Sequence, residues 1–321
     1  MSKSILLIGT GPMAAEYLKI LTAKASGEVT VAGRDDGRLA GVKAAFPGVD
    51  TFRLPPAGAP LGRTWDAAIL ASGIPDLAGD LERCLAAGIP QVLVEKPVTT
   101  DLTRLKRLAD LAAGKGARVR VATNRRHYGS IRKLKAILAG ESPLGASFDF
   151  TEWLSRVPKA WESHEGGQRL ALSNSFHVFD TVEHLLGAFK KEAGFHGETG
   201  AVAWHPDPVV FFGYGKAGTT PVVYGTSWIS PGRWAIEVMT REGRYRLAPM
   251  EKLAVLRHGT LEWKEIPLDN QVDLDFKPGL AGVVGEFLVP PGGGEALLPD
   301  LNAYLQMATR MADLCGYKAA P

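Results

Sequence analysis

Residues 5–14 read Ile-Leu-Leu-Ile-Gly-Thr-Gly-Pro-Met-Ala, a short apolar run followed at once by a glycine-rich turn. Four consecutive apolar residues are typical of a strand buried on both faces, as in a parallel sheet. The amphipathic residues 14–25 after the turn predict a helix. A strand, a glycine turn and a helix in this order predict the first unit of a doubly wound α/β sheet.

The same alternation continues to residue 124. Apolar runs predict further buried strands at 29–32, 67–70, 91–94 and 119–122, and amphipathic segments predict helices at 76–87 and 103–113. We therefore expect residues 1–124 to form an N-terminal dinucleotide-binding domain of the Rossmann type, with a doubly wound parallel sheet.

The pattern changes in residues 125–321. Strand-like pieces there follow one another through tight turns at 242–244 and 258–259, without helices between them. This predicts a second, α+β domain with a large, mainly antiparallel open sheet. Proline and glycine at 55–60 and 290–294 predict loops. The strands are expected at 146–153, 209–214, 222–229, 234–240, 245–248, 254–257 and 261–266, and the helices at 130–139, 174–186 and 301–314.

Composition limits the class of protein. A chain of 321 residues suits two domains, and 37 basic against 34 acidic residues leave a net charge of only +3, without a basic run. We therefore expect neither a nucleic acid nor a membrane as partner. Two cysteines, no apolar run of about 20 residues and a first apolar run too short for a signal peptide lead us to expect a cytoplasmic protein.

The turn after the first strand has the spacing of a dinucleotide-binding fingerprint. Gly9 allows the tight turn, Gly11 lets the backbone approach a pyrophosphate, and Ala14 lets the following helix pack closely on the strand. Glycine turns also end strands for purely structural reasons, but the position of this one, at the first strand-to-helix junction, favours cofactor binding. The binding candidates here are Gly9, Thr10, Gly11, Pro12 and Met13.

The end of the second strand bears on the choice between NAD and NADP. An acidic residue that holds the ribose hydroxyl of NAD is expected there, and the sequence has Gly33 followed by Arg34. A glycine leaves room for a 2′-phosphate and an arginine can bind it, so we expect NADP to be preferred, with NAD possible. In the alternative interpretation Arg34 is exposed in a turn, and Asp35 or Asp36 binds NAD.

Polar residues also follow later strands, at the edge where a ligand binds in open α/β sheets. Ser72 and Gly73 end one strand, where we expect the backbone to approach the cofactor. Glu95, Lys96 and Pro97 follow the next. A lysine at this edge can hydrogen-bond a substrate hydroxyl or carbonyl, although a lysine taken alone is usually a surface residue.

The fingerprint, the Glu95–Lys96–Pro97 segment, Asn124-Arg125-Arg126 and His177-x-x-Asp180 together resemble the Gfo/Idh/MocA oxidoreductases, named after glucose-fructose oxidoreductase and inositol dehydrogenase. The resemblance covers essentially the whole chain, and it implies that the second domain, residues 125–321, is a substrate-binding and oligomerisation domain. It implies NAD(P)-dependent hydride transfer at a CH–OH carbon of a sugar, inositol or related small polyol. It also implies that Lys96 is catalytic, that Lys96–Pro97 is a cis peptide and that Glu95 lies under the cofactor.

One position departs from the family pattern. Family members commonly carry an aspartate four residues before the histidine, and this chain has Ser173 there. His177 is the candidate general acid/base, because histidine titrates nearest neutral pH. An amphipathic surface helix would show the same polar stripe. A metal held by His177, Asp180 and His184 is not expected, since no further ligand cluster is nearby.

Further substrate-binding candidates rest on weaker signals, and each has a plain structural alternative. Asn124 and Arg126 leave the sixth strand at the ligand edge, but arginines there could simply cap the strand end. Trp153 could stack on a sugar, although tryptophan more often packs. Asn174 and Asp180 lie on the helix of His177, and Asp180 could equally be structural.

Two functions follow from these patterns. The first is an NADPH-linked oxidoreductase acting on CH–OH groups of a sugar or polyol, in which Lys96 and His177 handle the hydroxyl proton. The second is a non-catalytic NADP-binding regulator of the same fold, which the serine at position 173 keeps open. A broad sheet in the second domain can bury its face against a second copy, so we expect a homodimer or higher homo-oligomer.

Overall fold

The computed structural model describes residues 3–24, 27–289 and 296–317. The loop predicted at 290–294 lies outside these residues. The chain divides into two compact units, Met1–Asn124 with Asp275–Leu305, and Arg125–Leu274 with Gln306–Pro321. The predicted division assigns all of 125–321 to the second domain, whereas here residues 275–305 group with the first.

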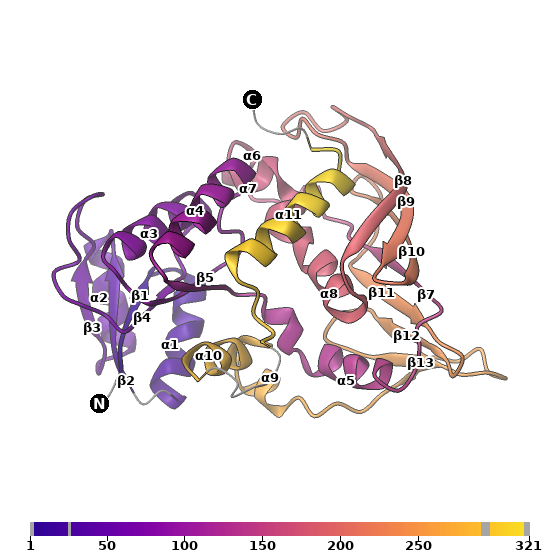
Figure 1. Cartoon of the computed structure of the whole chain (residues 1–321), viewed down its shortest axis with the longest axis horizontal. Coiled ribbons are helices and arrows are strands. Elements are labelled where there is room, and N and C mark those ends of the chain that lie inside the picture. Colours follow the sequence, from indigo (N-terminus) through magenta and orange to yellow (C-terminus); the bar gives the residue numbers. More distant parts are fainter. Residues whose placement is uncertain (1–2, 25–26, 290–295, 318–321) are drawn as a thin grey trace. The chain divides into compact units, whose positions relative to one another are not determined.

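The first unit contains a parallel sheet with the strand order β3-β2-β1-β4-β5-β6 (Figure 1). The order reverses between β1 and β4, so their carboxyl ends open the crevice where such sheets bind ligands. The parallel sheet predicted from the apolar runs is confirmed. Its elements are β1 (Lys3–Ile8), α1 (Pro12–Lys24), β2 (Gly27–Gly33), α2 (Asp36–Ala45), β3 (Asp50–Arg53), β4 (Ala67–Leu70), α3 (Ile74–Ala86), β5 (Gln91–Val94), α4 (Leu102–Gly114) and β6 (Arg118–Val121).

Helix α10 (Leu280–Leu288) explains why the C-terminal segment belongs to the first unit. Its Leu280, Val283 and Phe287 are buried in the same core cluster as Ile5 and Leu7 of β1. Figure 1 shows α10 beside α1 on one face of the sheet, with α3 and α4 on the other. The sequence-based division missed this return because the helix lies far along the chain from the core that it completes.

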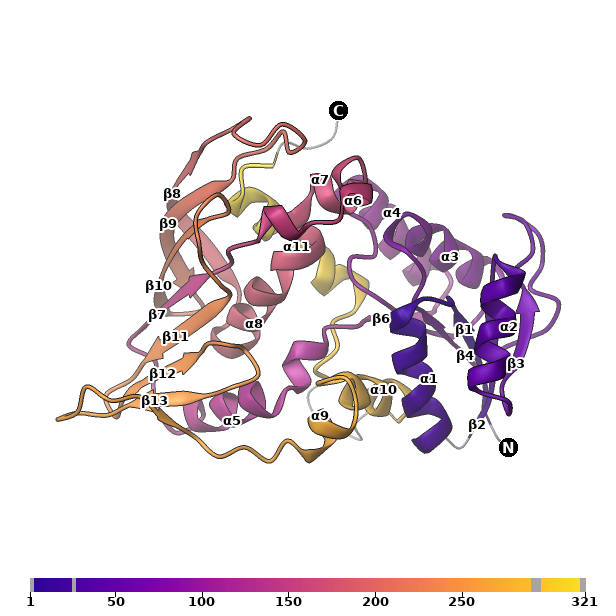
Figure 2. The same cartoon turned by 180° about the vertical axis from the view of Figure 1, so that it is seen from behind.

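The second unit contains a mainly antiparallel sheet with the order β14-β13-β12-β11-β7-β10-β9-β8, in which β7 and β10 pair in parallel. In Figure 2 the strands lie side by side at the left, and α8 packs against the sheet. The predicted open antiparallel sheet is confirmed. Its strands are β7 (Gly145–Asp149), β8 (Phe189–Gly197), β9 (Val210–Ala217), β10 (Thr220–Ser227), β11 (Ala235–Met239), β12 (Arg244–Leu247), β13 (Ala254–Leu256) and β14 (Lys264–Glu265).

Several boundaries in this unit differ from the predicted ones. The strand expected at 146–153 ends at Asp149, because the Asp149 carboxylate accepts hydrogen bonds from the backbone N–H and hydroxyl of Thr151 and turns the chain. The segment expected at 261–266 is a strand only at Lys264–Glu265. The helices are α5 (Gly129–Leu138), α6 (Lys159–Glu162), α7 (Glu165–Gln168), α8 (Phe176–Leu186), α9 (Gln271–Asp275) and α11 (Leu301–Leu314), and irregular turns lie at Asn124–His127, Leu154–Arg156 and Ala171–Ser175.

Candidate active site

The turn between β1 and α1 is shaped by two glycines with different roles. Gly9 has φ +135°, and a Cβ there would lie 2.4 Å from the carbonyl oxygen of Ala71, so only glycine fits. A Cβ on Gly11 would meet no atom within 4 Å. The open space over Gly11, at the N-terminus of a helix without acidic residues in its first turn, fits the pyrophosphate of a dinucleotide.

The segment after β5 lies at the same edge of the sheet, because all strands of this sheet are parallel. The Glu95 carboxylate accepts a hydrogen bond of 2.7 Å from the buried Tyr17 hydroxyl of α1. Burial raises the pKa of Glu95, opposed by this hydrogen bond and by the charge of Lys96. The Lys96–Pro97 peptide bond is cis, as the resemblance implies.

Arg34 follows β2 and forms an ion pair with the buried Asp80 of α3 (Nη2–Oδ1, 2.6 Å). The Ser72 hydroxyl donates to the other oxygen of the same carboxylate, at 2.7 Å. The position beside Gly33 is filled, since a Cβ there would lie 2.6 Å from the Thr10 side chain and 3.0 Å from Leu39. Packing thus accounts for the glycine, and its role toward a 2′-phosphate stays a prediction.

The two aspartates that could bind the ribose of NAD already have partners. Asp35 caps α2 by accepting a hydrogen bond of 2.7 Å from the backbone N–H of Arg38. Asp36 pairs with Arg53, which ends β3 and is the register partner of Gly33 on β2. Arg34 and Arg53 line one cavity of about 680 Å³. Arg83 also lines it, as do the carboxylates of Asp76, Asp80 and Glu82, so basic and acidic groups meet where the adenosine of a dinucleotide is expected.

The remaining candidates of the first unit lie at the ends of strands. Ser72 follows β4, and Gly73 is the N-terminal cap of α3. Pro97 is buried. The Asn124 amide follows β6 and donates a hydrogen bond of 3.1 Å to the carbonyl oxygen of Pro278.

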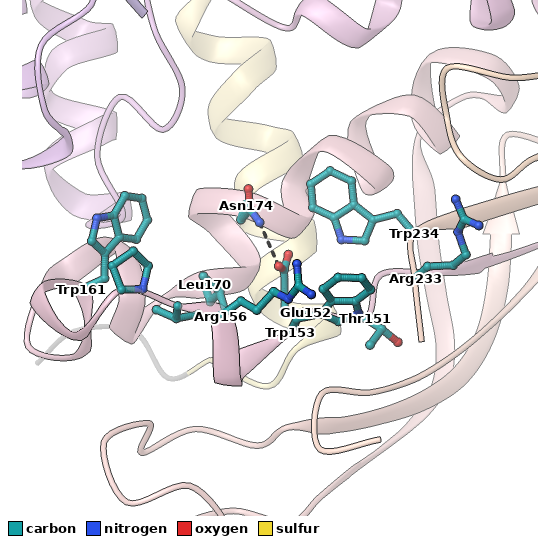
Figure 3. Close-up of a pocket in the computed structure, with 11 residues that line it drawn as sticks. Thr151, Glu152, Trp153, Arg156, Trp161, Leu170, Asn174, Arg233 and Trp234 are labelled. Carbon is teal, nitrogen blue, oxygen red and sulfur yellow. Dashed lines mark hydrogen bonds between the residues drawn. The ribbon is translucent and has the colours of Figure 1, made fainter. Parts of the chain in front are cut away.

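The second unit contains its own pocket, with a volume of about 510 Å³ (Figure 3). Three indole rings line it, those of Trp153, Trp161 and Trp234, together with Arg156 and Arg233. The Trp153 indole N–H donates to the carbonyl oxygen of Gly232 at 2.6 Å. This combination of aromatic walls and a few polar groups is typical of a small-molecule site.

A carboxylate that the sequence-based candidates do not include lies in the wall of this pocket. Glu152 is only 6% exposed and accepts hydrogen bonds from the Asn174 amide at 2.8 Å and the Ser175 hydroxyl at 2.5 Å. Figure 3 shows the Asn174 amide directed at the Glu152 carboxylate. The available signal was the position of Glu152 just after a strand, beside Trp153.

His177 lies in the first turn of α8, a helix buried along almost its whole length. Its ring centroid is 5.9 Å from that of Trp234, which lines the pocket. The Arg125 guanidinium lies 4.9 Å from the Trp234 ring centroid. The surface-helix interpretation of this segment is wrong, because His177, Asp180 and Val182 are all buried.

Arg126 and Asp180 bind each other. The guanidinium donates from Nε (2.9 Å) and Nη2 (2.6 Å) to Oδ1 of Asp180, and the carboxylate is 1% exposed. Neither residue lines the pocket in the second unit. This contact supports the structural interpretation of both residues, because it ties α8 to the turn at Asn124–His127, and a role toward substrate stays a prediction.

Ser173, which stands where the family commonly has an aspartate, does not line this pocket. The Ser173 hydroxyl is buried and donates to the carbonyl oxygen of Gly166, within the irregular turn that precedes α8. Burial, with the nearby charges of Arg126 and Lys135, lowers the pKa of His184 to about 3. Within the described parts of the chain, no group of three or more histidine, cysteine or acidic residues could hold a metal ion.

A profile described as "Oxidoreductase family, NAD-binding Rossmann fold" and named for Gfo/Idh/MocA matches residues 3–123, the segment that carries the dinucleotide turn and the Glu95–Lys96–Pro97 edge. Residues 3–123 therefore form an NAD-binding domain of the Gfo/Idh/MocA oxidoreductase family. The predicted family is thereby confirmed for this domain. No curated protein matches the sequence.

Solved structures of this fold match over nearly the whole chain. An oxidoreductase from Agrobacterium radiobacter, in complex with NAD⁺, L-tartaric acid and magnesium, is 15% identical, with a TM-score of 0.76 over 97% of this chain and 94% of that one. A UDP-N-acetylglucosamine 3-dehydrogenase from Acidithiobacillus ferrooxidans is 14% identical (TM-score 0.74, 98% and 97%). A Synechocystis biliverdin reductase, in complex with biliverdin and NADP⁺, is 16% identical, with a TM-score of 0.71 over 98% of this chain and 99% of that one. At such identities the likeness establishes the fold.

Proposed function

We propose that this protein is an NADPH-preferring oxidoreductase that transfers a hydride to or from a CH–OH or carbonyl carbon of a sugar, inositol or related small polyol. The observation that carries the proposal is the common edge of the parallel sheet. The open turn at Gly11 and the Glu95–Lys96–Pro97 segment both lie at this edge. Members of this fold include enzymes named as dehydrogenases of a sugar nucleotide, which is consistent with such a substrate.

The residues divide the work as follows. When bound, the nicotinamide group supplies or accepts the hydride. The Lys96 ammonium, hydrogen-bonded to the substrate oxygen, and the imidazole of His177 together handle the hydroxyl proton. Tyr17 holds Glu95 beside Lys96 through the hydrogen bond of 2.7 Å. Asn124 and the segment at Ser72 and Gly73 complete the cofactor edge.

The proposed preference for NADPH rests on the arginines around the cavity of about 680 Å³. Asp35 accepts a hydrogen bond from the α2 backbone, and Asp36 pairs with Arg53. These contacts count against either aspartate as the ligand of the ribose. Arg34 and Arg53 would bind the 2′-phosphate of NADP. A larger rise in melting temperature with NAD than with NADP would contradict this preference.

We also propose a homodimer formed through the sheet of the second unit. Phe195 of β8 and Phe212 of β9 are register partners, as are Tyr214 of β9 and Val223 of β10. All four side chains are at least half exposed. Neighbouring apolar side chains of this size are typical of an interface, and a second copy of the same face is the simplest partner.

A cytoplasmic location is part of the proposal and is supported by the cysteines. Cys84 and Cys315 are both free and buried. Burial raises the pKa of Cys84 to about 12, which makes its thiol unreactive. Two unlinked thiols suit a reducing compartment. No helix in the described segments is long and apolar enough to span a bilayer.

The test is substrate-dependent oxidation of NADPH, followed by its absorbance, across a panel of keto sugars and inosones. The Lys96→Ala variant should still bind NADPH, and its turnover should fall by about 100- to 10,000-fold, the range for a lost acid/base group. Lys106→Ala is the matched control, because Lys106 is an exposed lysine of the same unit, paired with Asp110.

Unchanged turnover in the Lys96→Ala variant would contradict the catalytic assignment. Tight NADPH binding without oxidation by any compound of the panel would favour the regulator instead.

A further inference from the structure

The pocket of the second unit contains a buried carboxylate whose position is set by neighbouring side chains. Glu152 lies in the segment after β7, and the Asn174 amide and Ser175 hydroxyl both donate to it. The carboxylate is thereby held by two consecutive residues of the turn that leads into α8.

This arrangement links Glu152 to the acid/base candidate. Asn174 and Ser175 precede His177 by three and two residues, so the turn that holds the carboxylate also begins the helix of the imidazole. Trp234 lines the same pocket and contacts the His177 ring. A ligand bound to Glu152 would therefore be held at a fixed place relative to His177.

The surroundings make Glu152 suited to a hydroxyl donor. A carboxylate accepts hydrogen bonds only, and bonds from hydroxyl groups to an ionised acceptor are short and strong. The indole rings of Trp153, Trp161 and Trp234 line the same pocket and lower the local polarity, which strengthens such a bond. Ser173 does not line this pocket, and its hydroxyl is directed to the Gly166 carbonyl.

We propose that Glu152 is the substrate-binding carboxylate of this chain, which accepts hydrogen bonds from the hydroxyl groups of a polyhydroxylated ligand in the pocket lined by the three tryptophans. The inference rests on the proposed function, since it specifies how the same substrate is recognised.

The experiment is a titration of the whole protein followed by tryptophan fluorescence, because three of its seven tryptophans line the pocket. The probes are myo-inositol, D-glucuronate and UDP-N-acetylglucosamine. We expect saturable quenching with at least one of them. Glu152→Gln should raise its Kd by about ten- to a hundredfold, because a neutral amide replaces the charged acceptor, while NADPH binding stays unchanged.

Glu141→Gln is the matched control. Like Glu152, Glu141 accepts hydrogen bonds from two side chains, here the hydroxyls of Tyr245 and Thr240. Unlike Glu152, it does not line the pocket. This variant should keep the wild-type Kd. If Glu152→Gln does not fold, Glu152→Asp serves in its place, since it keeps the charge and withdraws it by one methylene; its Kd should still rise severalfold.

The outcomes separate this inference from the proposed function. An unchanged Kd in the Glu152 variant, an equal loss in Glu141→Gln, or no saturable quenching by any probe would overturn the role of Glu152. Oxidation of NADPH with unaltered kcat and KM in Glu152→Gln would overturn it too, and would leave the redox function standing. Binding that depends on Glu152, without any NADPH oxidation, would support the inference and count against the redox function.

Discussion

Single residues at the dinucleotide turn show how the same amino acid serves two purposes. Gly9 is required by the fold, since its φ is +135° and a Cβ would meet the Ala71 carbonyl at 2.4 Å. Gly11 is not required by the fold, because the space beyond its Cα is open. The sequence pattern predicted both glycines but could not separate these reasons, which depend on β4, a strand some 60 residues away.

Substitution of these two glycines by alanine should separate the two purposes. Gly9→Ala should lower the free energy of unfolding by about 1–3 kcal/mol, because of backbone strain and the clash. Gly11→Ala should leave that free energy nearly unchanged and weaken NADPH binding at least about tenfold, because its methyl group occupies the pyrophosphate space. Urea unfolding and cofactor titration measure the two effects. Full NADPH affinity in a folded Gly11→Ala protein would contradict this assignment.

Arg34 and Arg53, the two arginines proposed to bind the 2′-phosphate, differ in how cleanly substitution can test them. Arg34 pairs with the buried Asp80, so its removal would leave a buried charge without its partner. Arg53 pairs with the exposed Asp36 and is itself 64% exposed. Arg53→Ala is therefore expected to change stability little.

In the Arg53→Ala variant we expect the Kd for NADPH to rise about tenfold or more and the Kd for NADH to stay the same, because only NADPH presents the 2′-phosphate. Isothermal calorimetry with both cofactors measures this. Arg107→Ala, at an exposed arginine of α4 outside the cavity, is the control. Equal losses for NADPH and NADH would refute the phosphate contact.

At the scale of elements, the sequence predicted strands best where both faces are buried. The runs that became β4 and β5 are apolar throughout, since each strand lies between helices on both faces of the sheet. Strand β8 was not predicted, because it is an edge strand with mostly exposed residues and reads Phe-Lys-Lys-Glu-Ala-Gly-Phe-His-Gly. Helix α10 was not predicted, because its burial depends on packing against α1, which lies more than 250 residues earlier in the chain.

The candidate site followed the same rule. Gly9, Lys96 and His177 became candidates because local motifs mark them, and their roles toward cofactor and substrate stay predictions. Glu152 could not, because its burial and its bonds to Asn174 and Ser175 arise from tertiary contacts. The ion pair between Asp180 and Arg126 could not be predicted either, because it depends on the packing of α8 against the turn that contains Arg126.

The buried ion pair that anchors α8 gives a prediction for this element. Arg126→Ala should lower the free energy of unfolding by about 3–5 kcal/mol, because it leaves the Asp180 carboxylate buried without its counterion. Arg126→Met combined with Asp180→Leu should recover most of the loss. Urea unfolding measures both.

Lys252→Ala, which removes an exposed pair with Glu265 in the same unit, should cost no more than about 1 kcal/mol. A loss in Arg126→Ala no larger than in this control would show that the buried pair does not anchor the helix.

For the whole molecule, the exposed apolar side chains of β8, β9 and β10 predict self-association. Phe212→Lys places a charge at the centre of this face, where Phe212 is 52% exposed and lies opposite Phe195. We expect the variant to sediment as a monomer, while the wild type and Leu261→Lys sediment as dimers. Leu261 is almost fully exposed near the other edge of the sheet, so it tests for a general effect of added charge. A dimeric Phe212→Lys protein would refute this interface.

The chain passes between its two units three times, after Asn124, after Leu274 and after Leu305. A segment near the C-terminus completes the edge of the first sheet. There the backbone N–H of Val121 in β6 donates to the carbonyl oxygen of Pro299 at 2.9 Å. A gene fragment that ends at residue 124 therefore encodes a domain without part of its core and without its edge partner. Exchange of the second unit between relatives, in the laboratory or in evolution, requires matched crossovers at all three junctions, and a single splice would leave both halves incomplete.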